Sequence, residues 1–126
     1  MTKLHPRLLA KYVFSRIGQR DERVIVGPAY GEDSAIIDIG DGRVLVVHSN
    51  PITGAIENIG WLAVHISAND VAVRGAKPCW LLPVILLPEG ASERAVDLIT
   101  QQINLAAKGI GAMVVGGHIE LSLIHI

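Results

Sequence analysis

Two pairs of adjacent polar residues interrupt apolar parts of this chain. Glu32-Asp33 stands directly before an apolar segment, and Asn69-Asp70 lies inside the Ala-rich stretch ISANDVAVRGAKP. Magnesium prefers oxygen ligands and usually takes one or two carboxylates, while waters and phosphate oxygens fill its other positions. Asp33 and Asp70 are therefore candidate ligands of a magnesium ion that carries a polyphosphate.

Two more polar clusters follow segments that are expected to be strands. His48-Ser49-Asn50 comes after RVLVV, and Gly116-Gly117-His118 comes after AMVV. Polar residues on loops held by a rigid sheet are where binding sites are commonly built. A Gly-Gly pair at a strand end lets backbone N–H groups approach phosphate, because no Cβ intrudes.

Each of these signals, taken alone, also fits an ordinary structural role. Glu32-Asp33 also fits a turn before a strand, Asn69-Asp70 fits the solvated end of a helix, and Gly116-Gly117 fits a turn. The chain has no GxxxxGK[ST] segment, so the site is not a P-loop, and its single cysteine and scattered histidines lack zinc spacing. The order and spacing of the four clusters are what support the magnesium–phosphate hypothesis.

The apolar periodicity predicts the elements that would position these clusters. Gly40-Asp41-Gly42 is a hairpin signal between two strands, and Ser92 is a candidate N-cap. Hairpin and crossover connections both occur, so we expect an α/β (α+β) fold with a mixed sheet. Helices are expected at 6–17, 58–73 and 92–108, and strands at 24–26, 34–39, 43–48, 79–87 and 112–115.

Length and composition narrow the class of protein. The 126 residues suit one domain, and 11 basic against 12 acidic residues, with no basic block and 4% aromatic residues, argue against a nucleic-acid partner. No apolar run reaches the ~18 residues of a membrane span, and no secretory signal is visible. The single cysteine, Cys79, fits a reducing cytoplasm. Half the residues are hydrophobic, which suggests a surface partly covered by another subunit or by further sequence.

The last six residues, LSLIHI, are those that the transposon-end adapter of sequencing libraries encodes when it is read in frame. We therefore expect residues 121–126 to be a non-native tail and the natural protein to continue beyond residue 120. A genomic sequence with a stop codon after Ile126 would contradict this expectation. The tail, including His125, is left out of the functional reasoning.

The four clusters occur in an order that resembles one protein family. GEDSAII, SNPITGA, IGWLAVHISANDVAVRGAKP and GGHIE together resemble the N-terminal domain of the AIR synthase-like (PurM-like) superfamily, over most of residues 4–120. Its members include aminoimidazole ribonucleotide synthase, thiamine-monophosphate kinase, selenophosphate synthetase and the hydrogenase maturation factor HypE. The resemblance implies a mixed sheet with helices packed on one face, a homodimer formed by sheet pairing, and a C-terminal domain that this chain lacks.

The resemblance also implies roles for individual residues. Asp33 and Asp70 correspond to acidic residues that bind Mg²⁺ and the phosphates of ATP, and Asn50 corresponds to a strand-end aspartate that is a further metal ligand. The residues that correspond to the nucleotide-binding motifs are Gly31, Glu32, Asp33, Asn50, Asn69, Gly116, Gly117 and His118. Catalytic residues are not identified.

Two departures from the family pattern bear on the site. Asn50 replaces the strand-end aspartate, and Ile119 replaces a threonine after the glycine turn. An asparagine ligates magnesium through a neutral oxygen, so the affinity for the cation should fall. Either the chain is a divergent member with weakened metal binding, or the two positions are sequence errors.

The resemblance leaves more than one function open. The first hypothesis is a Mg-ATP-binding domain of a HypE-like enzyme that phosphorylates or activates an oxygen of a small-molecule or protein-peptide substrate. A thiamine-monophosphate kinase-like domain is the second hypothesis. A non-catalytic dimerisation or nucleotide-sensing module is the third, and a fragment without activity of its own is the fourth.

Overall fold

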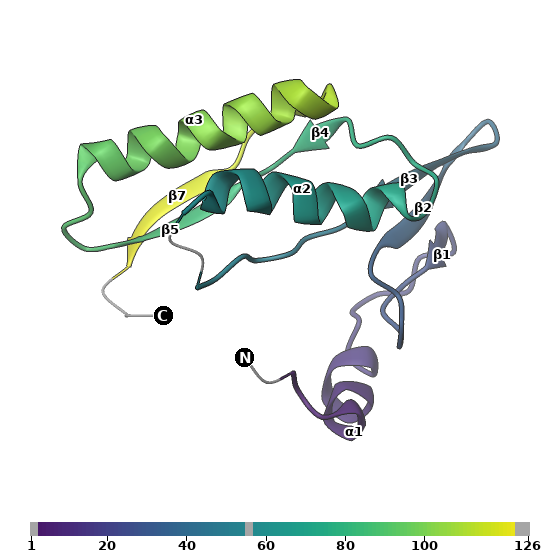
Figure 1. The fold of residues 1–126 in the computed structure, drawn as a ribbon. Helices are drawn as coiled ribbons and strands as arrows, with labels where there is room; N and C mark the ends of the chain where they lie inside the picture. Colours follow the sequence, from purple (N-terminus) through teal and green to yellow (C-terminus); the bar gives the residue numbers. More distant parts are fainter. Residues whose placement is uncertain (1–2, 55–56, 123–126) are drawn as a thin grey trace. The chain divides into compact units, whose positions relative to one another are not determined.

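The structure is a computed structural model that describes residues 3–54 and 57–122. The chain divides into two compact units, residues 1–48 and residues 49–126. Figure 1 shows their helices and strands.

The first unit is built around a three-stranded antiparallel sheet. Strands β1 (Val24–Val26), β2 (Ala35–Gly40) and β3 (Arg43–Val47) pair in the order β1-β2-β3. Asp41 and Gly42 both have positive φ, of 55° and 71°. These angles suit the tight hairpin turn that Asp-Gly favours, because its twist matches that of the flanking strands. The hairpin prediction is confirmed.

The N-terminal helix is shorter and less regular than its periodicity predicts. Helix α1 (Pro6–Leu8) continues directly into a π-helix, η1 (Leu9–Phe14), so the expected helix over 6–17 ends three residues early. The Ser15 hydroxyl donates to the Lys11 carbonyl. A serine that bonds to its own helix backbone competes with the regular ladder, which accounts for the early end.

The second unit packs two helices on parallel strands. Helix α2 (Ile59–Ala72) and helix α3 (Glu93–Ile110) lie side by side in Figure 1, on one face of strands β5 (Val84–Pro88) and β7 (His118–Ser122). A buried cluster of Val64, Ile103 and Ala106 joins the two helices, and Leu81 and Ile85 of the strands pack against it. The α/β class is confirmed. The expected single mixed sheet is not found among the described residues, whose strands form one antiparallel sheet and two parallel pairs.

The segment 79–87, expected as one strand, is two strands. Strand β4 (Trp80–Leu81) pairs with β6 (Met113–Val114), and β5 pairs with β7, both in parallel. Residues 82 and 83 separate β4 from β5 because Pro83 has no N–H to give to a ladder. The expected last strand, 112–115, is β6, and the chain then forms β7 instead of leaving the sheet at His118.

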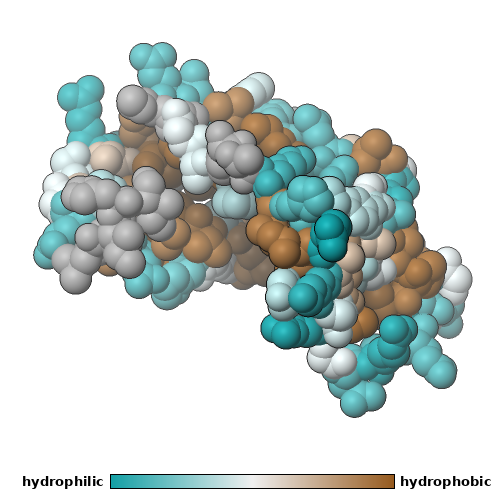
Figure 2. Space-filling model, turned by 90° about the horizontal axis from the view of Figure 1, so that it is seen from below, coloured by the Kyte–Doolittle hydropathy of each residue, from teal (hydrophilic) through white to brown (hydrophobic). Residues whose placement is uncertain are grey.

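Many large apolar side chains remain exposed on the described residues. Figure 2 shows hydrophobic surface, in brown, on the face that it draws. The exposed side chains of the second unit include Trp80, Val84, Leu86 and Met113 on its strands and Leu98 and Leu105 on α3. Among the described residues, no helix is both long and apolar enough to cross a membrane.

Candidate functional site

Asn50 and Asp70 lie close together although 20 residues separate them in the sequence. The side-chain Nδ2 of Asn50 donates to Oδ2 of Asp70 over 3.4 Å. Asn50 lies in the loop that leads to α2, and Asp70 lies in the last turn of α2. Two of the four polar clusters therefore meet in the second unit, at the C-terminal end of α2.

Helix α2 is held at its other end by α3. Its N-cap, Asn58, has a φ of 57° and makes no side-chain capping bond. The first-turn amide of Gly60 donates instead to Oε1 of Gln102 on α3, over 3.0 Å. This side chain takes the place of a local cap, because the first N–H groups of a helix have no partner within it.

Gly60 also sets how closely the two helices approach. A Cβ at residue 60 would lie 2.6 Å from the backbone oxygen of Ile99 and 2.9 Å from Cβ of Gln102. Only glycine fits a crossing of this kind, in which one backbone touches the other. The crossing fixes α2 on α3, and α2 in turn carries Asp70.

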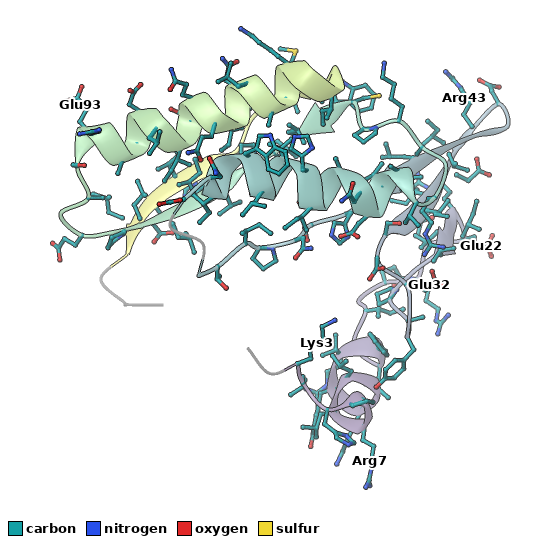
Figure 3. The ribbon with its side chains drawn as sticks, viewed as in Figure 1. Lys3, Arg7, Glu22, Glu32, Arg43 and Glu93 are labelled. Carbon is teal, nitrogen blue, oxygen red and sulfur yellow. The ribbon has the colours of Figure 1, made fainter. Side chains whose placement is uncertain are left out.

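In the first unit, the cluster before β2 meets the end of β3. Nδ1 of His48 contacts the backbone oxygen of Asp33. Ser34 is buried beside it, whereas the carboxylates of Glu32 and Asp33 belong to exposed residues. Figure 3 shows Glu32 projecting from this loop.

Gly116 and Gly117 lie opposite the break between β4 and β5. Gly117 has a φ of 145°, and a Cβ there would lie 2.3 Å from the carbonyl oxygen of Pro83. The amide of His118 donates to the same oxygen over 3.0 Å. The close backbone approach thus accounts for Gly117, and the amide of His118 is engaged within the sheet.

The side chains of His118 and Glu120 lie on one face of β7. Nε2 of His118 is 3.7 Å from Oε2 of Glu120, and both side chains are largely exposed. His118 is paired with Val84, and Glu120 with Leu86, so these four residues share a face of the two-stranded ladder. This exposed pair is available to a ligand or to a second subunit.

The donor set at Asn50 and Asp70 fits magnesium in part. One carboxylate and one amide oxygen are ligands that this ion accepts, and it commonly keeps several waters besides. Within residues 3–54 and 57–122, no group of three or more His, Cys, Asp or Glu side chains is arranged to hold a metal. A cation at this position would therefore need phosphate oxygens or waters to complete its ligands.

The predicted site residues fall into three groups in the structure. His48 touches the Asp33 backbone, Asn50 touches Asp70, and Gly116, Gly117 and His118 belong to the strand region. Gly31 has a φ of 72° in the turn before β2, and Asn69 is exposed on α2. Sequence reasoning missed Gln102, which only its contact with Gly60 reveals.

The family of the chain follows from comparison with known proteins. The family model described as "AIR synthase related protein, N-terminal domain" matches residues 31–125. The chain belongs to this family. The family resemblance noted in the sequence is confirmed.

Relatives within the AIR synthase-related group include two named enzymes. The chain is 30% identical over 93 residues to the carbamoyl dehydratase HypE of Bradyrhizobium diazoefficiens, covering 71% of the chain and 27% of that protein. It is 31% identical over 122 residues to the thiamine-monophosphate kinase of Archaeoglobus fulgidus, covering 90% of the chain and 39% of that protein. The chain thus spans well under half the length of either relative.

A solved structure of AaThiL complexed with AMPPCP and TMP has the same fold over much of the chain. The TM-score is 0.67 at 24% identity, and the match covers 76% of this chain and 33% of that one. At this identity the likeness shows the fold alone.

Proposed function

We propose that this chain is the Mg-ATP-binding domain of a HypE-like, ATP-dependent enzyme that phosphorylates or activates an oxygen of its substrate. The observation that carries the proposal is the contact of Asn50 with Asp70. Two motif residues that are distant in the sequence meet there, with the amide nitrogen of Asn50 against a carboxylate oxygen of Asp70. Two similar proteins add support, since one is a thiamine-monophosphate kinase and the other, AaThiL, is complexed with AMPPCP, an ATP analogue.

The family pattern offers Asp33, in the motif GEDSAII, as a second carboxylate ligand of the cation. The chemistry that Mg²⁺ would supply, when bound, is to offset charge on the transferring phosphoryl group. The ion would be held by Asp33, Asn50 and Asp70. The nucleotide would be contacted and oriented by the other motif residues, which are Gly31, Glu32, Asn69, Gly116, Gly117 and His118.

The test is titration calorimetry of the chain with AMPPCP in the presence of Mg²⁺. Replacing Asp70 by Ala should weaken binding at least about tenfold, because a charge-assisted contact to the cation is lost. Asp97→Ala is the matched control, since Asp97 is an exposed carboxylate on α3. Equal binding by wild type and Asp70→Ala would rule out Asp70 as a ligand. If wild type, Asp70→Ala and Asp97→Ala all fail to bind AMPPCP, the result would favour a non-catalytic dimerisation module.

A thiamine-monophosphate kinase-like function is the second candidate. It is favoured by the 31% identity over 122 residues to the Archaeoglobus enzyme, a longer match than that to the HypE relative. The kinase-like and HypE-like functions are distinguished by the Tm of the chain with Mg-AMPPCP, measured with and without thiamine monophosphate. A further rise in Tm with thiamine monophosphate supports the kinase, and no change supports the HypE-like assignment.

A further inference from the structure

We propose that in this chain the side-chain amide of Asn50 replaces a divalent cation as the partner of Asp70. The site is then held together without metal, and Mg²⁺ binds only by displacing the amide NH₂ group. This inference deepens the proposed function and rests on it for the identity of the cation. It concerns a property that the sequence alone does not reveal, namely which atom of Asn50 faces Asp70.

The contact itself joins a donor to a carboxylate. Nδ2 of Asn50 lies 3.4 Å from Oδ2 of Asp70. Hydrogen bonds of this kind are usually 2.7–3.2 Å long, so this one is long and therefore weak. A weak bond at an exposed position still orders the two side chains, and it is readily exchanged for a stronger partner.

The chemistry of the asparagine side chain makes the exchange simple. An amide carries a donor on nitrogen and an acceptor on oxygen, so a half-turn of the group swaps one for the other. When the NH₂ group of Asn50 points toward Asp70, the two side chains bond to each other and need no metal. When the amide oxygen of Asn50 points that way instead, it and a carboxylate oxygen of Asp70 can both bind a cation placed between them.

A carboxylate at residue 50 would behave differently. An ionised aspartate has no donor, so at the separation seen here it would repel Asp70 unless a cation lay between them. The family's aspartate therefore makes the pairing of these positions depend on metal, whereas Asn50 removes that dependence. The same replacement lowers the charge that attracts Mg²⁺.

The backbone helps to hold Asn50 in place for this role. Pro51 follows it, and a residue before proline is restricted to extended conformations. Asp70 is fixed independently, because α2 is clamped to α3 through Gly60 and Gln102. Two constrained positions thus meet through one rotatable amide.

The experiment measures thermal unfolding of the 126-residue chain in EDTA and in millimolar Mg²⁺, without nucleotide. Asn50→Asp should melt below wild type in EDTA and should gain more than wild type from Mg²⁺. Its Kd for Mg²⁺, from calorimetry, should be about tenfold lower than that of wild type, since a second carboxylate joins the ligand set. Asn104→Asp is the matched control, because Asn104 is an exposed asparagine on α3.

A second measurement reads the amide directly. In ¹H–¹⁵N spectra, the Asn50 side-chain NH₂ signals should shift in Asp70→Ala and on addition of Mg²⁺ to wild type. An Asn50→Asp protein that folds only with Mg²⁺ would support the proposal. One that fails to fold in Mg²⁺, or that matches wild type in EDTA and in Mg²⁺, would overturn it.

The outcomes also separate this inference from the proposed function. If the Mg²⁺ and EDTA pattern holds but no variant binds AMPPCP, the role of Asn50 stands and the nucleotide assignment fails. If AMPPCP binds with Mg²⁺ but Asn50→Asp responds to the metal as wild type does, the nucleotide assignment stands and the role of Asn50 fails.

Discussion

Gly117 is held in a backbone conformation that side chains rarely adopt. Its φ is 145°, and the carbonyl oxygen of Pro83 lies 2.3 Å from the position that a Cβ would take. Gly117→Ala should therefore destabilise the chain by about 1–3 kcal/mol from backbone strain alone, and the contact with Pro83 adds to this. Chemical denaturation measures the loss, with Gly109→Ala as the control because nothing lies near a Cβ there. Equal effects at the two glycines would contradict the role of Gly117.

Asp21 and Arg23 form a compact ion pair in the first unit. The side chain of Arg23 donates to both carboxylate oxygens of Asp21, at distances down to 2.6 Å. These side-chain hydrogen bonds, followed by the one from the Arg23 backbone N–H, lower the pKa of Asp21 from 3.8 to about 2. The hydrogen bonds favour the ionised form of the carboxyl group.

The sign of the resulting pH dependence is fixed by the lowered pKa of Asp21. The pair's contribution to stability is present above pH 3.8 and is lost as the pH falls through about 2. An NMR titration should show the carboxyl of Asp21 ionising at about pH 2, and Arg23→Gln should return its pKa toward 3.8. A pKa of Asp21 that Arg23→Gln leaves unchanged would show that the contact is absent in solution.

Sequence reasoning identified candidate residues at this scale but not their contacts. The residue types that magnesium prefers predict Asp70, and the family resemblance adds Asn50, but only the fold brings the two side chains within hydrogen-bonding distance. Gly117 was assigned to phosphate binding because a Gly-Gly turn permits it. Its contact with Pro83 involves a residue 34 positions earlier, which no local pattern encodes.

At the scale of elements, the crossing of α2 and α3 depends on one glycine and one glutamine. Gly60→Ala should cost about 1–3 kcal/mol, because an added methyl group in a packed contact forces the backbones apart. A Cβ there would meet the backbone oxygen of Ile99 at 2.6 Å, and a backbone atom cannot rotate away. Denaturant unfolding measures the change in the free energy of unfolding. Ala72→Gly, at an exposed position of α2, is the control, because it measures the effect of exchanging alanine and glycine in this helix without the contact to α3. A stabilised Gly60→Ala protein would contradict the close crossing.

Gln102 should act on the start of α2. Gln102→Ala removes the acceptor of the Gly60 amide, so it should cost about 1 kcal/mol, the usual net value of such a bond. Hydrogen exchange should show faster exchange in the first turn of α2 and little change near Asp70. Gln101→Ala, at the exposed neighbouring position, is the control. If exchange rises equally in both variants, the cap from α3 is not present in solution.

Local signals predicted some elements well and others poorly. The α3 start was predicted from Ser92, and its hydroxyl does accept the amide of Ala95 over 3.2 Å. The segment 79–87 was read as one strand because its apolar residues run without interruption. Pro83 divides this segment into β4 and β5, and the break faces the break between β6 and β7 on the neighbouring segment. The two breaks are distant in the sequence and meet only in the tertiary structure, so the periodicity of one segment does not predict them.

For the molecule as a whole, the exposed apolar residues of β5 bear on assembly. Val84 and Leu86 are 66% and 51% exposed, while Ile85 packs toward the core cluster of the helices. An exposed apolar strand face fits the proposed pairing of sheets in a homodimer. The high hydrophobic content of the sequence suggested a covered surface, but not which face is covered.

This assembly is tested with one added charge. Val84→Lys should convert the proposed homodimer to monomer in sedimentation velocity, because the lysine ammonium would lose its hydration at the interface. Leu105→Lys should leave the proposed homodimer intact, since Leu105 is a similarly exposed apolar residue but lies on helix α3 and not on the β5 strand face. Far-UV circular dichroism checks that both proteins fold. A wild type that is monomeric at all concentrations, or a Val84→Lys dimer, would contradict pairing through this face.

The two segments that separate the parallel strand pairs differ in length by one residue. Leu82 and Pro83 lie between the ladders on one segment and residues 115–117 on the other, so the register shifts by one residue from the first ladder to the second. A one-residue slip moves the side chains of a strand to the other face of its sheet. Deleting one of residues 115–117 would therefore remove this offset and turn inward-facing side chains of β7 outward, and sequence alignments of relatives should show the same one-residue difference between the two segments.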